Sequence, residues 1–342
     1  MAEVTIYTIA KELNMTPSMV SRAFNPAGKI NEEKRKLVLE TAKKYNFSPN
    51  RFASRLSMKP IKIGVFIRSK FKVNSDKMLI GIKKAYEELK DYKITYDITL
   101  RNPLEEQSFD YESELMKYKD FDGVIVAGLS FDKYTKALKK LCEANKNVVQ
   151  VQAANENVPC LFASKHSEET SSNLAAEFLQ NCLKKSESKN ILLFTGDKKN
   201  TQHVVAESFF EKACEERGLV LTESISMMDS EVYFREILPE IMKKYKGKID
   251  GVYITSGFSR PLCEYMEKEG LDFSLVAFDI HENIKEYLER GIISAAINQN
   301  VSLQMESAFT NLSKYLITEE KCPEMIYTDI DLVLKSNMHQ FE

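Results

Sequence analysis

The stretch TIAKELNMTPSMVSRAFN, residues 8–25, contains two short helical patterns separated by a tight break. Thr5 is placed to cap the first helix and Thr16 the second, with Pro17 at the first helical position, where a missing N–H costs nothing. The first helix would bury one apolar face, formed by Ile6, Ile9, Ala10 and Leu13. The second would bury Met19, Val20, Ala23 and Phe24. The spacing therefore predicts a compact helix–turn–helix unit.

The outer face of the second helix carries small polar groups and one arginine: Pro17, Ser18, Ser21 and Arg22. Such a face on the second of two tightly joined helices suits the major groove of DNA. Arg22 could bond a guanine edge or a phosphate, and Pro17 could make only an apolar contact. A third helix after Asn31 would bury Val38, Leu39, Ala42 and Tyr45. The pattern alone also allows a three-helix protein-binding module.

Charge is distributed unevenly along the 342 residues, whose net charge is −2. Residues 1–60 carry 11 Lys and Arg against 5 Asp and Glu, a net of +6, so the remainder carries −8. A basic end on an acidic body favours an anionic partner for that end. Surface lysine-rich helices also produce such counts, so charge alone does not identify nucleic acid.

The composition argues against several classes of protein. The apolar and charged fractions, 43% and 29%, are those of a soluble globular chain. No apolar run approaches the ~20 residues of a membrane span, and the first residues lack a signal-peptide pattern. We therefore expect a cytoplasmic protein with no membrane partner. Six cysteines lie far apart without a CxxC, and the four histidines are scattered, so we expect reduced thiols and no metal site.

Three stretches carry a more specific signal: TIYTIAKELNMTPSMVSRAFN (5–25), INEEKRKLVLETAKKYNFSPNRFASRL (30–56) and IGVFI (63–67). Together they resemble the headpiece of the LacI family of bacterial transcription regulators. The matching motifs are Val20–Arg22, Asn25, Ser48-Pro49-Asn50 and Leu56. The departures are small, since Thr8 stands where an aspartate is usual and Asn14 where a glycine is usual.

The resemblance implies roles for the headpiece residues. A homodimer would bind a pseudo-palindromic operator whose sequence is chosen by Pro17, Ser18 and Arg22. The phosphates would be held mainly by Thr5, Thr16, Ser21 and Asn25.

A short joint, SPNRFASRLSMKP at residues 48–60, connects the headpiece to the rest. Asn50 can cap a helix of residues 51–56, which is far below the ~12–15 residues at which an isolated helix becomes marginal in water. The resemblance implies that two such helices pair in the DNA minor groove, with Ser54 allowing close approach and Leu56 acting as the wedge. Without the resemblance, a plain linker is the simpler interpretation.

From residue 62 onward, β-rich runs alternate with helical patterns in two series, which predicts two doubly wound parallel sheets. The fold class is therefore α/β, with a small all-α domain in front. This is the arrangement of a type 1 periplasmic-binding-protein module, with its ligand between the subdomains. We expect a helix-turn-helix domain at 1–47 and a hinge at 48–60. The two subdomains would comprise 61–164 plus 298–322, and 165–297 plus 323–342.

Polar residues at strand ends predict the ligand contacts. Asp279 ends the strand LVAFD, and family members often hold paired ligand hydroxyls with an acid there, although Asp279 could instead cap a helix of residues 280–290. Gln299 follows the strand AAIN. The opposite wall would consist of Arg68, Ser69 and Phe71.

Other ligand positions of the family are not matched. Val205 or Ala206 replaces the usual arginine, Ser256-Gly257 replaces the usual acidic pair, and His203 could be a substitute donor. The effector would then be an unusual saccharide, a sugar derivative or a different metabolite. No GxGxxG or GKS/GKT loop and no paired catalytic spacing occurs, so we expect neither an enzyme nor a cofactor.

These patterns predict a ligand-responsive DNA-binding regulator, a repressor of carbohydrate-metabolism genes. The alternative is a solute-binding receptor with no role at DNA.

Overall fold

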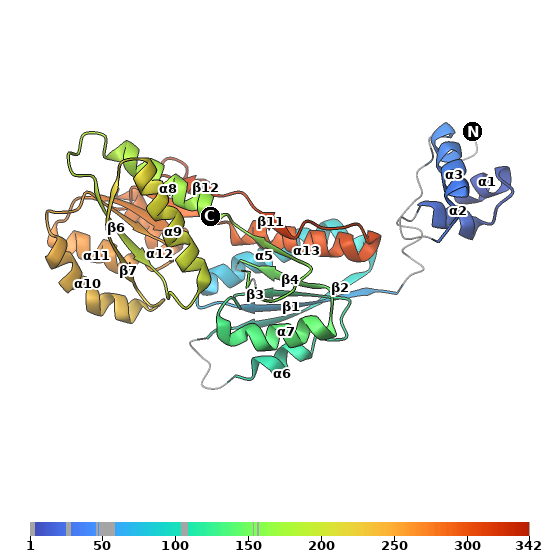
Figure 1. Cartoon of the computed structure of the whole chain (residues 1–342), viewed down its shortest axis with the longest axis horizontal. Helices are drawn as coiled ribbons and strands as arrows, with labels where there is room; N and C mark the ends of the chain where they lie inside the picture. Colours follow the sequence, from blue (N-terminus) through green and yellow to red (C-terminus); the bar gives the residue numbers. More distant parts are fainter. Residues whose placement is uncertain are drawn as a thin grey trace.

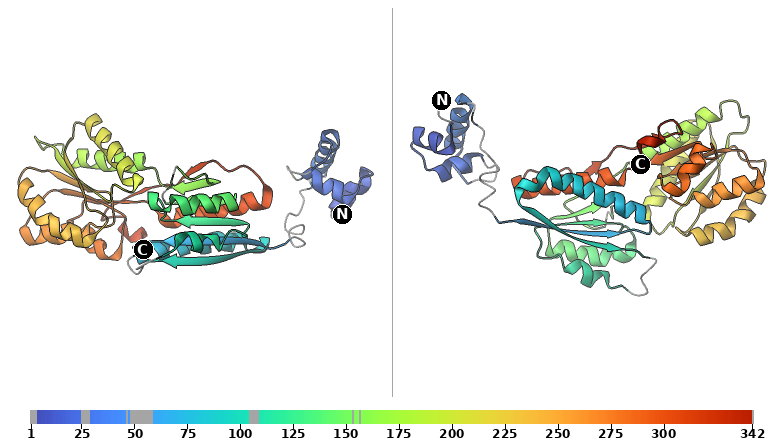
Figure 2. Two further views of the ribbon diagram at one scale, coloured as in Figure 1. Left: turned by 60° about the horizontal axis from the view of Figure 1, so that its bottom comes forward. Right: turned by 180° about the vertical axis from the view of Figure 1, so that it is seen from behind.

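The computed structural model describes residues 4–24, 29–45, 47, 59–103, 109–152, 154–155 and 157–341. Figures 1 and 2 show a small helical headpiece standing apart from a larger body in which helices surround β-sheets. The helices of this headpiece are α1 (Ile6–Glu12), α2 (Pro17–Phe24) and α3 (Glu32–Lys44).

The predicted caps of the headpiece are present. Thr5 Oγ1 accepts from the Thr8 N–H at 3.3 Å, and Thr8 Oγ1 accepts in return from the Thr5 N–H at 3.1 Å. Thr8 thus completes a capping box, which satisfies two N–H groups at the helix start. Thr16 Oγ1 accepts from the Met19 N–H at 3.2 Å. Between the two helices, Asn14 adopts a φ of 51°, a left-handed conformation that asparagine tolerates better than most residues.

The headpiece core is smaller than the sequence predicted. Its fully buried apolar residues are Ile9, Ala10, Val20, Ala23, Val38 and Ala42. The prediction that Leu39 and Tyr45 face inward is wrong, because their exposed fractions are 44% and 37%. Leu39 follows the buried Val38 and therefore lies beside the buried face of α3, turned toward solvent. Tyr45 is the C-cap, where the helix has already ended.

The first sheet of the body has the strand order β11-β5-β4-β3-β1-β2, all parallel. Its strands are β1 (Ile61–Arg68), β2 (Ile94–Arg101), β3 (Gly123–Ala127), β4 (Val148–Val151), β5 (Phe162–Lys165) and β11 (Met325–Tyr327). Its helices are α5 (Lys72–Leu89), α6 (Tyr111–Met116), α7 (Thr135–Ala144) and α13 (Val301–Thr318). One face packs on α5 and α13 and the other on α6 and α7, which explains why the inner strands are continuously apolar.

The second sheet has the order β12-β10-β9-β8-β6-β7, and only β12 is antiparallel to its neighbour. Its strands are β6 (Asn190–Thr195), β7 (Val220–Ser226), β8 (Gly251–Ile254), β9 (Ser274–Phe278), β10 (Ala295–Asn298) and β12 (Asp331–Val333). Helices α8 (Glu168–Cys182) and α9 (Thr201–Glu216) cover one face. The other is covered by α10 (Glu231–Tyr245), α11 (Arg260–Glu269) and α12 (Glu282–Glu289). The predicted pair of doubly wound α/β units is therefore confirmed.

The chain crosses between the sheets three times: after β5, after β10 and between β11 and β12. The expected boundary at residue 323 is wrong in one respect, because β11 pairs with β5 and belongs to the first sheet. The stretch 325–334, which reads as one strand in the sequence, is divided between two sheets. The described part of the chain also contains short 3-10 turns, η1 (Lys90–Tyr92), η2 (Asp132–Tyr134) and η3 (Met338–Gln340). Among the described residues, no helix combines the length and apolar character that membrane crossing requires.

Candidate ligand-binding site

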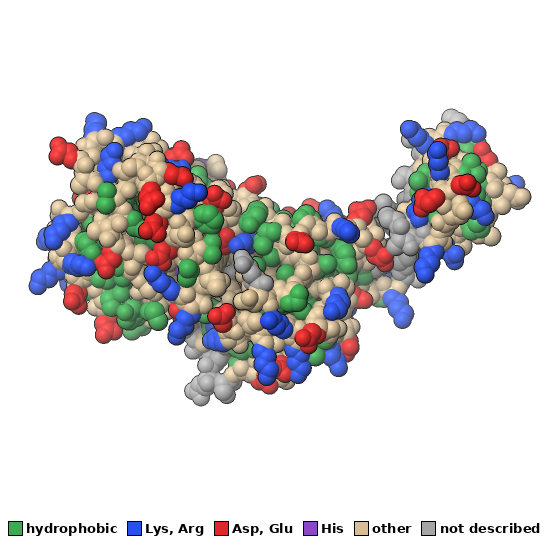
Figure 3. All heavy atoms as spheres, in the orientation of Figure 1, with side chains coloured by type: hydrophobic (Ala, Val, Ile, Leu, Met, Phe, Trp, Pro, Cys, Tyr) green, Lys and Arg blue, Asp and Glu red, His purple; other side chains and the backbone are tan. Residues whose placement is uncertain are grey.

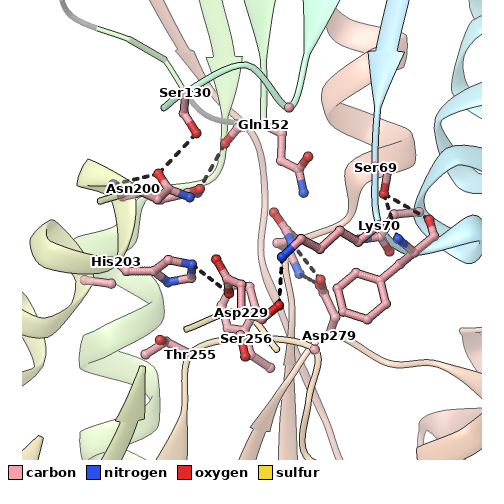
Figure 4. A pocket seen from close by; sticks show the side chains of 18 of the residues that line it. Ser69, Lys70, Ser130, Gln152, Asn200, His203, Asp229, Thr255, Ser256 and Asp279 are labelled. Atoms are coloured by element: carbon pink, nitrogen blue, oxygen red, sulfur yellow. Dashed lines mark hydrogen bonds and ion pairs between the residues drawn. The ribbon is translucent and has the colours of Figure 1, made fainter. Parts of the chain in front are cut away.

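A cavity of about 150 Å³ lies between the two subdomains, lined by residues that follow the carboxyl ends of strands in both sheets. Figure 4 shows polar side chains from both subdomains converging on it. Ligands of open α/β sheets bind in this position, outside the strand ends. A cavity of roughly 150 Å³ holds a molecule of about one six-membered ring.

All seven residues that the sequence nominated for the ligand line this cavity: Arg68, Ser69, Phe71, His203, Ser256, Asp279 and Gln299. They come from five segments that are far apart in the chain. Their contact with a ligand remains a prediction, but the sheets do bring them together.

Asp279 is held by the residue that follows the crossover strand. Gln299 Nε2 donates to one carboxylate oxygen of Asp279 at 2.7 Å, and Asp279 is buried with a φ of 62°. The residue at the N-cap of α12 is His281, so the alternative interpretation of Asp279 as that cap is wrong. A buried carboxylate with one neutral partner keeps acceptor capacity for ligand hydroxyls.

Two of the nominated residues make contacts within their own subdomain. Arg68 Nε donates to the Tyr111 hydroxyl at 2.8 Å, and the guanidinium lies 5.1 Å from the ring centre of Tyr134. Ser69 Oγ closes a local turn by donating to the Phe71 carbonyl at 2.9 Å. Ser69 therefore shapes the loop more than it offers a free hydroxyl.

His203 pairs with Asp229, a residue that the sequence analysis did not nominate. His203 Nε2 lies 3.4 Å from Asp229 Oδ1. Burial alone would raise the pKa of the Asp229 carboxyl, but the hydrogen bond and charge of His203 outweigh it and lower that pKa. Gly196 makes the approach possible, since a Cβ there would lie 2.2 Å from His203 Nε2.

Hydrogen bonds join the two subdomains across the cavity, so the cleft is closed. The ammonium of Lys70 donates to the Asp229 carbonyl at 2.7 Å, and Ser130 Oγ lies 3.1 Å from Asn200 Oδ1. Gln202 Nε2 donates to the Gln152 carbonyl at 3.2 Å. None of these six residues was nominated from the sequence. Each partner lies on another segment, so no local pattern could indicate the pairing.

An aromatic contact also spans the cleft. The ring of Phe71 stacks on His281, with centres 5.5 Å apart and planes at 18°, and contacts Phe258 at 4.9 Å. Gly257 leaves room for this stack, because a Cβ there would lie 3.0 Å from His281 Nε2. Phe71 therefore belongs to both the wall and the closure of the cavity.

Three buried polar atoms of the cavity wall have no hydrogen-bond partner in the described chain: His166 Nδ1, Ser256 Oγ and Gln299 Oε1. Burial also lowers the pKa of His166, which favours the neutral imidazole. Buried polar atoms are nearly always satisfied, so these three indicate a polar molecule in the cavity.

The structure resolves one register that the sequence left open. Ala206 is buried and lines the cavity, whereas Val205 is exposed. The position at which the family usually carries an arginine is therefore occupied by a methyl group. Within the described residues, no group of three acidic, histidine or cysteine side chains could hold a metal ion.

The nominated DNA-contacting residues of α2 lie on its outer surface. Ser18, Ser21 and Arg22 are exposed, and Pro17 is half-buried. Thr5 and Thr16 are exposed, and their oxygens cap α1 and α2. Figure 3 shows lysine and arginine side chains on the headpiece surface. The remaining nominated residues, Asn25, Asn50, Ser54 and Leu56, lie outside the described residues.

Comparison with known proteins gives the class of this chain. The family described as periplasmic binding protein domain matches residues 60–320, and the chain belongs to this family. The family and fold are those of regulators and solute-binding proteins, not of enzymes.

A relative and two solved structures place the chain more closely. Over 166 residues it is 31% identical to catabolite control protein B of Bacillus subtilis (strain 168), a match covering 46% of this chain and 49% of the relative. The chain thus spans about half the length of this curated relative. Together with the family match, this confirms the resemblance to the LacI family.

The two structures show the fold alone. A putative LacI transcriptional regulator from Bacteroides fragilis superposes with a TM-score of 0.69 at 20% identity, covering 83% of this chain and 100% of that one. GanP, a glucose-galactose binding protein from Geobacillus stearothermophilus, superposes with a TM-score of 0.71 at 17% identity, covering 82% and 99%.

Proposed function

We propose that this protein is a ligand-responsive, sequence-specific DNA-binding transcription regulator, a repressor of carbohydrate-metabolism genes that acts as a homodimer on a pseudo-palindromic operator. The observation that carries the proposal is the exposed polar face of α2, with Arg22 in its last turn, attached to a body with a polar cavity between its subdomains. A solute receptor needs the cavity but has no use for such a headpiece. The similarity to a catabolite control protein and to a putative LacI regulator supports the same assignment.

The proposed mechanism couples the cavity to the operator. Ligand binding would favour one arrangement of the two subdomains, because the bonds of Lys70, Gln202 and Ser130 form only when the walls meet. That arrangement would set the spacing of the two headpieces in the dimer. To move such an equilibrium from 1:99 to 99:1, the ligand must bind one arrangement more tightly than the other by ~5.5 kcal/mol. Two or three hydrogen bonds between the ligand and charged side chains, formed in that arrangement alone, can supply this difference.

Each cavity residue would contact a different part of the ligand. Asp279 and Gln299 would hold ligand hydroxyls, and Phe71 would pack on an apolar ring face. His203 and Ser256 would supply further polar contacts from the second subdomain. Arg68 and Ser69 would form the opposite wall. In the headpiece, Arg22, Ser18 and Pro17 would read bases, and Thr5, Thr16 and Ser21 would hold phosphates, with Asn25, Asn50, Ser54 and Leu56 assigned from the sequence alone.

A gel-shift series with Arg22→Ala tests the DNA assignment. On DNA from around the gene of this protein, the variant should bind its specific site 10- to 100-fold more weakly, since a bidentate base contact is worth about 1–3 kcal/mol. Lys36→Ala, an exposed change on α3, is the control and should leave the discrimination between specific and unrelated DNA unchanged. Tight operator binding that ignores Arg22 would contradict the role given to α2.

The second candidate is a solute-binding receptor without a DNA role, which the fold match to GanP favours. The two candidates differ in their salt dependence. If a basic headpiece contacts phosphates, the affinity for DNA should fall steeply as the salt concentration rises. A receptor should not bind DNA at any salt concentration.

A further inference from the structure

We propose that the cavity binds a ring-sized ligand that carries an anionic group, a phosphate or a carboxylate, held by Lys70 and Arg68. This inference rests on the proposed function, since it specifies the chemical class of the effector. It concerns a feature that the sequence analysis did not detect, namely an excess of positive charge on one wall.

Two cations line the first-subdomain wall of the cavity, and a third, the exposed Lys133, lies behind them. Arg68 ends β1, and Lys70 lies two residues beyond it; both are half-buried and line the cavity. Lys133 lies close by, because its ammonium and the guanidinium of Arg68 lie 5.0 Å and 5.1 Å from the ring centre of Tyr134. Arg68 and Lys133 share this ring, and both repel the charge of Lys70, so an anion beside Lys70 would relieve the repulsion.

None of these three cations forms an ion pair with a carboxylate in the described part of the chain. Arg68 Nε donates to the hydroxyl of Tyr111, and Lys70 Nζ donates to the backbone carbonyl of Asp229. A hydroxyl and a carbonyl accept the hydrogen bond but bring no negative charge. Burial lowers the pKa of Lys70 even though Asp229 and Asp197 attract its charge.

Asp229 and Asp197 lie close enough to attract the ammonium of Lys70, but their carboxylates have other hydrogen-bond partners. The Asp229 carboxylate pairs with His203 at 3.4 Å, and Asp197 Oδ1 accepts from the backbone N–H of Lys199 at 3.0 Å. In the close view of the site, the Lys70 side chain extends from its loop toward Asp229, between the two subdomains (Figure 4). Its remaining two N–H donors are available to a ligand oxygen.

The opposite pole of the cavity has a different character. Both oxygens of Glu168 bond the ammonium of Lys165, at 2.9 and 2.8 Å, so this acid is neutralised within the protein. Asp279 is bonded to the neutral amide of Gln299 and can accept from hydroxyls. A ligand with hydroxyls at one end and an anionic group at the other would therefore match both poles. A neutral sugar would leave the cations uncompensated in a closed cleft, and an amine would be repelled at their wall.

Calorimetry with matched probes at constant ionic strength tests this proposal on the full-length protein. The pairs are glucose with glucose 6-phosphate, fructose with fructose 6-phosphate, and galactose with galacturonate, and inorganic phosphate is added alone. We expect at least one anionic member to bind ten times or more tightly than its neutral partner. The phosphate and carboxylate arms then tell which anion the wall accepts.

Variants locate the effect. Lys70→Met should reduce that preference at least tenfold, whereas Lys72→Met, on the exposed neighbouring turn, should preserve it. Asp279→Asn should weaken the neutral and the anionic member alike. Each variant should melt close to the parent, which shows that it is folded; if Lys70→Met does not fold, Arg68→Gln takes its place.

Equal affinity within every pair, no response to any anion, or an anion preference that survives in Lys70→Met would each overturn the proposal. These outcomes leave the proposed DNA function standing, because the gel-shift with Arg22→Ala is performed without ligand. Conversely, if the protein proved not to bind DNA, the ligand affinities measured by calorimetry would be unchanged. The two proposals can therefore fail separately.

Discussion

The headpiece and the body place their polar side chains in opposite ways. In the headpiece, Ser18, Ser21 and Arg22 point outward over a core that, among the described residues, contains six fully buried apolar side chains. In the body, polar groups such as Asp279 and Gln299 are enclosed between two sheets, each packed between helix layers. A surface face can meet a partner larger than itself, whereas an enclosed cavity can select only a small molecule.

The two regions also differ in what stabilises them. The headpiece has little buried area and depends on local caps, each worth about 1 kcal/mol. The body depends on close contacts between helices far apart in the chain, and on buried groups that must remain uncharged. Changes that act on one kind of stabilisation should therefore affect one region and spare the other.

The largest expected effect is that of Gly81→Ala in the body. A Cβ at Gly81 of α5 would lie 2.1 Å from the backbone oxygen of Ser302 in α13, so the two helices would have to separate. We expect the free energy of unfolding of the body to fall by about 3 kcal/mol, while the headpiece keeps its own stability. Thermal unfolding followed by circular dichroism measures both. Lys84→Ala, an exposed change on the same helix, is the control, and equal melting of the two variants would contradict the packing argument.

An intermediate effect per pH unit is expected from mild acid, again on the body alone. Burial lowers the pKa of both His166 and His281 below the ordinary value of 6.5. The charged and titratable neighbours are Glu168, Asp279 and Lys165 for the first histidine, and Asp279 and Lys77 for the second.

The sign follows from linkage. Below pH 6.5 these histidines are protonated in the unfolded chain but stay neutral in the folded protein. The free energy of unfolding is therefore unaffected above pH 6.5 and decreases as the pH falls toward the lowered pKa values of the folded state. The expected loss is about 1.4 kcal/mol per pH unit for each histidine. Urea unfolding between pH 7 and 5 measures it. His281→Gln should flatten the slope, and a change at the exposed His339 should not. Residues 1–60 contain no histidine, so the headpiece should not share this sensitivity.

The smallest expected effect is that of Asn31→Ala in the headpiece. Asn31 Oδ1 caps α3 by accepting from the backbone N–H of Glu33 at 2.8 Å and of Lys34 at 3.4 Å. Loss of this cap should reduce headpiece stability by about 1 kcal/mol and leave the body unchanged. Asn31→Asp keeps the acceptor and serves as the matched control. If the alanine variant lowered body stability as well, the two regions would not be independent.

Much of the fold was predictable because its signals are local. The caps at Thr5 and Thr16 need only the next three residues, and strand–helix alternation indicated two parallel sheets. The errors occurred where the signal was weak or depended on another segment. Leu39 lies beside the buried face of its helix, and the stretch 325–334 divides between sheets because β5 and β10 each lack a neighbour on that side.

The seven nominated cavity residues follow a related rule, since most stand at a strand end or within two residues of it, and parallel strands present those ends at one edge. Lys70 shows where that rule stops. It follows the same strand end as Arg68, yet its partner, the Asp229 carbonyl, lies 159 residues further along the chain. Neither residue carries a pattern that indicates the other.

By itself, the sequence determined the helix–turn–helix, the two α/β units and the acid at the end of β9, since each depends on neighbours within a few residues or on the period of a strand. Only the tertiary structure decided that His203 meets Asp229, that Lys70 spans the cleft to a backbone carbonyl, and that β11 and β12 belong to different sheets. The physical reason is that a side chain finds its charge partner through the packing of whole layers, and that packing depends on contacts summed over the entire body.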